Sequence, residues 1–336
     1  MSTSNKEHQF SQWLDWIDAE HELMLARTIE LSHINSGSFN PDGVNKVGEK
    51  LIEYARILDA KVEVLPVEPF KHIDNNGVEQ ALPMGNAIRL TKRPDANLQI
   101  FFCGHLDTVF PIDSDFQTTK WLDDNTLNGP GVADLKGGLI VMLKAIEALE
   151  RSPYADNIGW EILFNPDEEI GSQGSAGFIA EAAKKVHLGM IYEPSFPDGN
   201  FAGERKGSGN FSIITRGKAA HAGREHHLGR NAVRAMCDFI SQLDDLNGQR
   251  DGVTINPALI EGGGASNVVP DMCLSRFNIR LEQPTDEQWC LDNIQSILDE
   301  INQRDGISIE MHGRFGRKPK LLTPANVKLF ELACES

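Results

Sequence analysis

The sequence has no long hydrophobic run and no excess of positive charge. No apolar stretch approaches the roughly 18 residues that cross a bilayer, and the polar residues 1–10 lack the apolar core of a secretory signal. Lys and Arg number 32 against 49 Asp and Glu, which gives a formal net charge of -17. Such an acidic chain is a poor partner for nucleic acid or for an anionic membrane. We therefore expect neither of these partners.

Cysteine is scarce and scattered. The five cysteines form no Cys-x-x-Cys pair and stand at positions Cys103, Cys237, Cys273, Cys290 and Cys334. An odd, dispersed set predicts neither a disulfide framework nor a thiolate zinc site. A reducing cytoplasm is the location that fits this pattern.

The chain also has no phosphate-binding loop. Gly129-x-Gly131-x-x-Asp134 begins like a dinucleotide fingerprint, but an acid stands where the third glycine belongs. No Gly-Lys-Ser/Thr follows it. Because a carboxylate there would repel a pyrophosphate, we exclude nucleotide binding.

What the first two hundred residues do contain is an alternation of strand-like and helical segments. We expect helices at 8–32, 43–58, 139–149 and 173–185, and the first of them ends at Ser36-Gly37-Ser38. We expect strands at 61–66, 86–91, 98–103, 160–164 and 188–192, with a hairpin at 120–128. Such alternation predicts an α/β fold, with a sheet covered by helices on both faces.

The central strand of this sheet is the apolar run 98–103, which reads as buried on both faces. It ends on Gly104 and is followed by His105 and Asp107. Residues two apart on an extended backbone point to the same side. A carboxylate could therefore hold one imidazole nitrogen while the other faces a metal. The plain alternative is a capped strand end with a surface His-Asp pair.

Further acidic residues follow the other predicted strand ends. Glu168 and Glu169 come after the strand at 160–164, Glu193 comes after 188–192, and Asp134 opens a helix after the glycine-rich turn. Working residues of open α/β sheets gather at the carboxyl ends of the strands. Each carboxylate alone could be an ordinary cap or surface charge. Together with His105 they predict a metal site.

These residues fall into motifs that resemble the M20 metallopeptidases, which include glutamate carboxypeptidases, acetylornithine deacetylase and succinyl-diaminopimelate desuccinylase. The resemblance extends over nearly the whole chain and is closest to the glutamate carboxypeptidase branch. The motifs are His105-x-Asp107, Gly-Pro-Gly-x-x-Asp134-x-Lys-Gly-Gly, Pro-Asp-Glu168-Glu169-x-Gly-Ser, Glu193-Pro, Gly217-Lys-Ala-Ala-His221-Ala-Gly and Ser266-Asn267-Val-Val-Pro270.

The resemblance implies a pair of zinc ions and a role for each residue. Asp134 would bridge the two ions, His105 and Glu193 would complete one of them, and Glu169 would serve the other. Glu168 matches the general base, and Asp107 supports His105. Manganese or cobalt could also occupy such a site.

The block 206–312 differs in character and reads as a small α+β domain inserted into the first. We expect its strands at 211–215, 253–259, 272–281 and 307–311 and its helices at 232–246 and 285–301. The resemblance makes residues 1–205 the metal-binding catalytic domain, a zinc-peptidase-like mixed sheet. It makes 206–312 the lid and dimerisation domain and 313–336 an incomplete return to the catalytic domain.

Three residues of the lid carry roles that the resemblance implies. His221 would reach across a homodimer to the oxyanion, Asn267 would lie at the substrate, and Arg280 would hold a substrate carboxylate, a task that suits its bidentate fork. Read without the family, His221 is a turn histidine between Gly217 and Gly223, and Arg280 is a surface arginine.

The sequence departs from the family pattern after the lid. The family supplies a final histidine to the metal that Glu169 serves, but no histidine follows His312. The resemblance therefore predicts either a truncated product or a degenerate member, with an incomplete second metal site.

The function that these observations predict is metal-dependent hydrolysis of an amide bond in a small peptide or N-acyl amino acid that carries a carboxylate. The alternative is a catalytically impaired, truncated family member that binds metal and carboxylated ligands without efficient turnover. An unrelated α/β binding protein is the third interpretation.

Overall fold

The computed structural model describes residues 3–196, 198–200 and 202–335. The chain forms two compact units. The first runs to Phe70 and includes Ala81–Ser195, and the second includes Lys71–Gln80 and the chain from Phe196 onward. Among the described residues, no helix has both the length and the apolar character that crossing a membrane requires.

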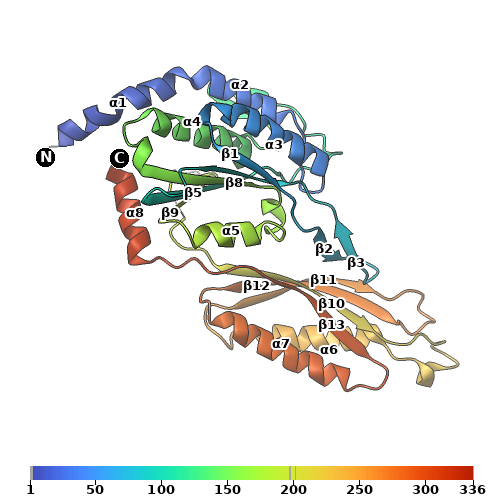
Figure 1. Ribbon diagram of the computed structural model, residues 1–336. Coiled ribbons are helices and arrows are strands. Elements are labelled where there is room, and N and C mark those ends of the chain that lie inside the picture. The colour runs from blue at the N-terminus through green and yellow to red at the C-terminus, as the bar shows by residue number, and fades with distance from the viewer. Residues whose placement is uncertain (1–2, 197, 201, 336) are drawn as a thin grey trace. The chain divides into compact units, whose positions relative to one another are not determined.

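The first unit is built on a five-stranded mixed sheet with the order β1-β4-β8-β5-β9 (Figure 1). Its strands are β1 (Lys61–Leu65), β4 (Ala87–Lys92), β5 (Leu98–His105), β8 (Ile158–Asn165) and β9 (Leu188–Ile191). β5 pairs in parallel with both β8 and β9, whereas β1, β4 and β8 pair antiparallel. The carboxyl ends of three adjacent strands, β8, β5 and β9, therefore meet at one edge of the sheet.

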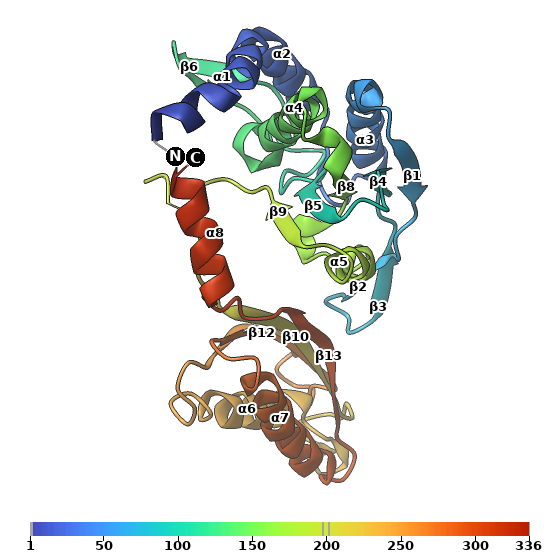
Figure 2. The same ribbon diagram turned by 60° about the vertical axis from the view of Figure 1, so that its left-hand side comes forward.

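Helices cover both faces of this sheet, as Figures 1 and 2 show. α2 (His21–Ser32), α3 (Pro41–Ala55) and α4 (Gly137–Arg151) lie on one face, and α5 (Ala176–Ala183) lies on the other. Alternate side chains of β5 pack into two apolar cores, one on each face of the sheet. Phe102 packs with Trp160 and the α3 and α4 side chains, whereas Phe101 and Cys103 pack toward α5. The predicted burial of the central strand on both faces is confirmed.

The N-terminal helical segment is two helices, not the single helix expected over 8–32. α1 (Thr3–Ala19) ends before Glu20, and α2 begins at His21. Neither glycine nor proline marks the junction in the sequence. The Glu20 carboxylate instead pairs with Lys144 Nζ of α4 at 2.9 Å, a tertiary contact that the local pattern cannot reveal.

The second unit is an antiparallel sheet with the order β11-β12-β10-β13, and α6 and α7 pack on one of its faces (Figure 2). The strands are β10 (Gly207–Arg216), β11 (Thr254–Gly262), β12 (Met272–Leu281) and β13 (Ser308–Arg317). The helices are α6 (Ala232–Asp244), α7 (Asp286–Asn302) and α8 (Pro324–Glu335). The predicted fold class, a mixed α/β sheet covered by helices together with an α+β unit, is confirmed.

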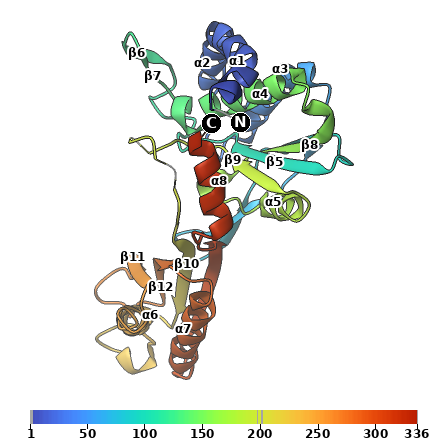
Figure 3. The ribbon, with the colours of Figure 1, turned by 90° about the vertical axis from the view of Figure 1, so that its left-hand side faces the viewer.

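Two hairpins complete the fold. The predicted hairpin at 120–128 is present as β6 (Lys120–Asp123) and β7 (Thr126–Asn128), which extends from the first unit (Figure 3). The hairpin of β2 (Phe70–Ile73) and β3 (Glu79–Leu82) was not expected from the sequence.

The β2–β3 hairpin lies with the second unit because Ile73 packs against Ile214 and Leu274, and Arg276 donates a hydrogen bond to the Ile73 carbonyl. The boundaries of the compact units thus differ from those expected at residues 205 and 312. Residues 71–80, 196–205 and α8 all fall in the second unit.

Candidate metal centre

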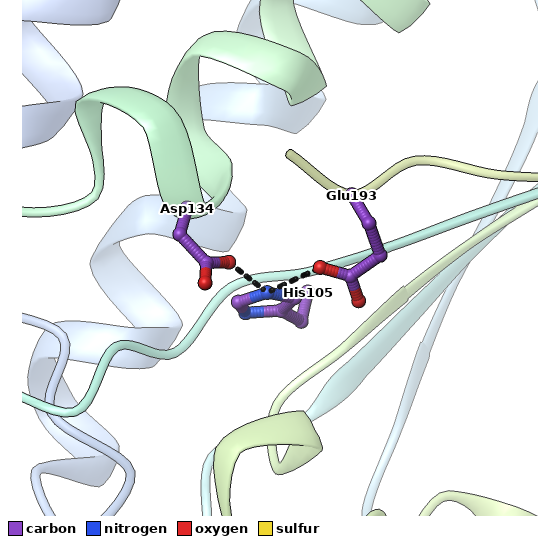
Figure 4. A group of neighbouring side chains, drawn as sticks. All are labelled: His105, Asp134 and Glu193. Atoms are coloured by element: carbon purple, nitrogen blue, oxygen red, sulfur yellow. Dashed lines mark hydrogen bonds and ion pairs between the residues drawn. The ribbon is translucent and has the colours of Figure 1, made fainter. Parts of the chain in front are cut away.

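His105 is the last residue of β5 and lies at the centre of an acidic cluster, with 1% of its surface exposed. Its Nε2 atom lies 2.9 Å from Asp134 Oδ1 and 3.9 Å from Glu193 Oε2. Figure 4 shows the imidazole between the two carboxylates. These three side chains offer one ligand atom each, all within 4.8 Å of one another. The structure thus brings three of the four predicted metal ligands together.

Asp134 is placed by the tight turn that precedes α4. Gly131 has a φ of 70°, which favours glycine. The turn is anchored to the end of α2, because Ser32 Oγ donates to the Pro130 carbonyl at 2.8 Å and Lys136 Nζ donates to the Ile34 carbonyl at 2.7 Å. The Asp134 side chain remains 51% exposed. It can therefore reach a metal from the solvent side of His105.

Glu193 is placed by the pairing of β9 with β5. The Tyr192 amide donates to the Cys103 carbonyl at 2.9 Å and so extends the parallel ladder by one residue past Ile191. Glu193 follows directly, with its side chain 35% exposed. The carboxylate reaches His105 because the two strand ends are neighbours in the sheet.

The second imidazole nitrogen of His105 faces Asp107, as the spacing predicts, but the closer acceptor is the main chain. Nδ1 lies 2.9 Å from the Asp107 carbonyl oxygen and 3.4 Å from Asp107 Oδ1. A proton on Nδ1 leaves Nε2 as the metal-facing nitrogen, because a hydrogen bond at one ring nitrogen fixes the tautomer.

The Asp107 carboxylate joins His105 to the glutamate pair. It accepts hydrogen bonds from the backbone amides of Glu168 at 3.1 Å and Glu169 at 3.2 Å, and from Ser38 Oγ at 2.6 Å. Asp107 is 1% exposed. A buried carboxylate surrounded by donors is a rigid support. Ser38 is a residue of the site that sequence reasoning missed, because its only signal is a helix break.

Asp167 supports the short helix that carries Glu168 and Glu169. The sequence analysis did not identify this residue either. Asp167 accepts hydrogen bonds from the Gly174 amide at 2.7 Å and from Ser175 Oγ at 2.5 Å. Its carbonyl accepts from the Ser172 amide. Burial raises the pKa of Asp167. These bonds fix the turn after β8 and thereby the direction of both glutamates.

The cluster is built to attract a cation. Burial alone would lower the pKa of His105, but hydrogen bonding with the carboxylates of Asp107 and Asp134 raises it to about 11. Burial, reinforced by the nearby carboxylates, raises the pKa of Glu169 to about 7. Excess negative charge around one imidazole thus holds protons that a divalent metal would displace.

The donor set fits a zinc-type ion. One imidazole nitrogen and two carboxylates are the ligands that zinc takes in catalytic sites, where three protein ligands leave a position for water or substrate. The half-exposed Asp134 and Glu193 provide that open side. Manganese or cobalt accepts the same atoms.

The predicted lid residues lie in the second unit. His221 follows β10 and forms an isolated bridge with Val268. Next to it, the Ala222 amide donates to the Asn267 carbonyl at 2.8 Å. Arg280 is near the opposite end of β12, paired in register with Ser208. The structure therefore brings His221 and Asn267 together but places Arg280 apart from them.

The fold and this donor set are those of an α/β protein with a candidate metal centre of the metallopeptidase type. Two family models match the chain: a peptidase dimerisation domain over residues 203–306, and peptidase family M28 over residues 86–193. The first covers most of the second unit, and the second covers the strands that carry His105, the glutamate pair and Glu193.

Known relatives point the same way. Carboxypeptidase G2 from Pseudomonas sp. (strain RS-16) is 28% identical over 188 residues, which cover 56% of this chain and 45% of the relative. A probable carboxypeptidase from Uncinocarpus reesii is 28% identical and covers 82% of this chain and 64% of its own length. Several curated relatives are matched over about half of their length.

Among solved structures, the M20 family metallo-carboxypeptidase Sso-CP2 from Sulfolobus solfataricus has the same fold. It gives a TM-score of 0.64 at 16% identity, with 88% of this chain and 78% of that chain covered. The dimerisation-domain match and the carboxypeptidase relatives support an M20 family metallopeptidase.

Proposed function

We propose that this protein hydrolyses an amide bond in a small carboxylate-bearing substrate, as a carboxypeptidase or N-acyl-amino-acid deacylase does. The observation that carries the proposal is the position of Asp107. One buried carboxylate supports the His105 ring and also accepts from the amides of Glu168 and Glu169. The proposed ligands and the proposed base are therefore held in one rigid frame, which is what positioned catalysis needs.

His105, Asp134 and Glu193 would hold one zinc ion, and Asp134 with Glu169 would bind a second, as the family resemblance implies. A divalent metal bound there lowers the pKa of water and polarises the scissile carbonyl. The raised pKa of Glu169 fits a side chain that lies among carboxylates and releases its proton when a cation arrives.

Glu168 is the proposed general base. It begins the short helix Glu168–Ile170, and its backbone amide is tied to Asp107. Its carboxylate would take a proton from the attacking water and deliver it to the leaving amine. A positioned base of this kind contributes about 10²–10⁴ in rate.

His221 is the proposed donor to the oxyanion. Its Nδ1 atom accepts hydrogen bonds from the backbone amides of Gly223 at 3.1 Å and Arg224 at 3.2 Å. In a neutral ring the proton is then on Nε2. The loop thereby holds a preformed N–H donor, which suits stabilisation of a developing negative charge. Asn267 lies beside it, and we propose that it contacts the substrate.

The length of β12 separates Asn267 from Arg280, and this separation supports a homodimer. The strand has 10 residues and spans roughly 30 Å at about 3.4 Å per residue. Asn267 precedes one end, and Arg280 lies near the other. One small substrate cannot touch both, so we propose that His221 and Asn267 serve one active site of a homodimer and that Arg280 holds the substrate carboxylate in the other.

The test is metal analysis combined with an amidase assay. The purified protein is loaded with zinc, manganese or cobalt and offered a panel of dipeptides and N-acyl amino acids. Hydrolysis that depends on metal and disappears in Glu168→Gln supports the proposal. Tight metal binding with no turnover on any member would instead favour the impaired, ligand-binding alternative. The cytoplasmic location stays a prediction.

A further inference from the structure

The β2–β3 hairpin is shared between the two compact units (Figure 1). Its outer ends belong to the first unit, whereas Lys71–Gln80 belongs to the second. The chain therefore crosses between the units at both ends of this segment, and once more between Ser195 and Phe196. We propose that the hairpin is a strap: it is rooted in the first unit, held by the sheet of the second, and limits the motion of one unit relative to the other.

An apolar contact seats the hairpin on the sheet of the second unit. Ile214 and Leu274 are paired across β10 and β12. Their chain neighbours Ile213 and Cys273 pack with α6 and α7 on the helical face. Because successive side chains of a strand alternate between faces, Ile214 and Leu274 point to the face without these helices. They are nevertheless 1% and 0% exposed, since Ile73 of the hairpin packs on them.

Two arginines of the same sheet hold the hairpin by its turn. Arg216, at the end of β10, donates from Nη2 to the Gly77 carbonyl at 2.7 Å. Arg276 of β12 donates to the Ile73 carbonyl at 3.2 Å and to Asn75 Oδ1 at 2.9 Å. Hydrogen bonds from a charged donor are stronger than bonds between neutral groups. Both sides of the turn are thus bound to the sheet.

Gly77 allows the turn to approach the sheet closely. Its φ of 67° favours glycine. A Cβ atom there would lie 3.1 Å from Ile214 Cγ2 and 3.3 Å from Arg216 Nη2. The turn is also fixed internally, because the Asp74 carboxylate accepts from the Val78 amide at 2.9 Å. It therefore presents the Gly77 carbonyl to Arg216 in a defined geometry.

The outer ends of the hairpin are attached within the first unit. On one side, the Phe70 ring contacts the Phe39 ring with 5.5 Å between centroids. On the other side, the Asn86 amide, just before β4, donates to Asn45 Oδ1 of α3 at 2.8 Å. The hairpin is thus held at its turn by one unit and at its ends by the other.

This arrangement gives the hairpin two states, docked and released. A two-stranded hairpin is only marginally stable by itself in water, so the order of β2 and β3 depends on the sheet beneath them. Units joined by a flexible linker move relative to each other by default. The docked hairpin adds a second, short attachment. Once released, Lys71–Gln80 becomes a slack loop and the restraint is lost.

The first arm of the test is hydrogen exchange of the hairpin amides, which measures the population of the released state. Arg216→Ala should raise the exchange rates within 71–80 by about 10-fold, the shift expected for the loss of one charged hydrogen bond. Arg234→Ala is the control, because Arg234 pairs with Asp238 on α6 and does not hold the hairpin. Rates in Arg216→Ala equal to those of the wild type would overturn the inference.

A second pair of variants approaches the same contact from the hairpin. Gly77→Ala adds a Cβ atom that crowds Ile214 and Arg216, and it should also accelerate exchange within 71–80. Gly248→Ala is the control, because Gly248 has a φ of 82° and, among the described residues beyond its chain neighbours, nothing lies within 4 Å of a Cβ atom placed there. Acceleration in both variants, or in neither, would contradict the assignment.

The second arm measures the restraint itself and needs no turnover. Spin labels are attached to Cys237, which is exposed on α6, and to Lys184→Cys at the end of α5, with the exposed Cys334 replaced by serine. The labelled protein is diluted with unlabelled protein, so that two labelled chains seldom meet.

The distribution of distances between the labels should be broader in Arg216→Ala and Gly77→Ala than in the wild type. It should be unchanged in Arg234→Ala and Gly248→Ala. A distribution that stays as narrow as in the wild type, although the hairpin amides exchange faster, would show that the hairpin does not restrain the units and would overturn the strap. The measurement does not use catalysis, so its outcome is independent of the proposed function.

Discussion

Ser38 donates its hydroxyl hydrogen bond to Asp107 Oδ2 at 2.6 Å, and both residues are buried. The two are separated by 69 positions in the chain. Ser38 lies where the chain leaves α2 for α3, and Asp107 lies just past β5. The bond connects the helical layer to Asp107, which supports the proposed metal centre. The first prediction concerns this bond.

Ser38→Ala should weaken zinc binding by about 10-fold, the low end of the 10–100-fold expected for outer partners of a metal site. The reason is that Asp107 loses a donor while its bonds to the glutamate amides remain. Competition with a chelator measures the zinc Kd. The control is Ser296→Ala, because that hydroxyl donates to the Asp292 carbonyl within α7. An unchanged Kd in Ser38→Ala would remove the bond from this role.

Asp107→Asn should weaken zinc binding further, by about 100-fold. An asparagine side chain has one oxygen, whereas the Asp107 carboxylate accepts from Ser38 and from two backbone amides. Its NH₂ group would therefore face a donor in a buried site, which is costly. Chelator competition and a thermal unfolding scan follow the change. A variant as tight as wild type would contradict the central place given to this carboxylate.

Glu168→Gln and Glu169→Gln should fail in different ways. Glu168→Gln should retain metal while kcat falls by about 10²–10⁴, the general-base contribution. Glu169→Gln should lose metal first, which elemental analysis of the purified protein would detect. A Glu168→Gln enzyme with most of its turnover would remove that residue from the role of base.

Zinc binding to metal-free protein should release protons, and fewer as the pH rises. His105, with a pKa of about 11, is protonated from pH 6 to pH 8 and must lose its proton to bind. Glu169, with a pKa of about 7, is mostly protonated at pH 6 and mostly ionised at pH 8. Release should therefore fall from nearly two protons toward one across this range.

Calorimetry in buffers of different ionisation enthalpy counts these protons. Both pKa values lie above the ordinary ones, so the proton-bound forms are favoured at low pH and zinc affinity should rise with pH. Heats that do not depend on the buffer would contradict the electrostatic description of the site.

A mixture of two inactive proteins should recover activity if the proposed homodimer exists. His221→Ala and Glu168→Gln each disable every site of their own dimer. In a heterodimer, one site combines an intact Glu168 with the intact His221 of the partner. No recovery in a mixture shown by mass spectrometry to contain heterodimers would count against action across the dimer.

Local sequence patterns predicted those parts of the structure that one short stretch of sequence determines by itself. The apolar run at 98–103 forces a buried strand, and the parallel strands β8, β5 and β9 bring the residues that follow them to one edge of the sheet. This is why His105 and Glu193 could be expected together before any coordinates, whereas Asp134 was expected from the glycine-rich turn that precedes a helix. Their roles as ligands, and those of Glu168 and Glu169, stay predictions.

Tertiary structure decided what depends on distant partners. Glu20, at the junction of α1 and α2, pairs with Lys144 of α4, and no local pattern marks that contact. The β2–β3 hairpin joins the second unit because Ile73 finds apolar partners about 140 and 200 residues away. Ser38 and Asp167 became visible as supports only through their hydrogen bonds. A hydroxyl or a carboxylate has no local pattern that names its partner, since the bond forms wherever folding brings a donor and an acceptor together away from water.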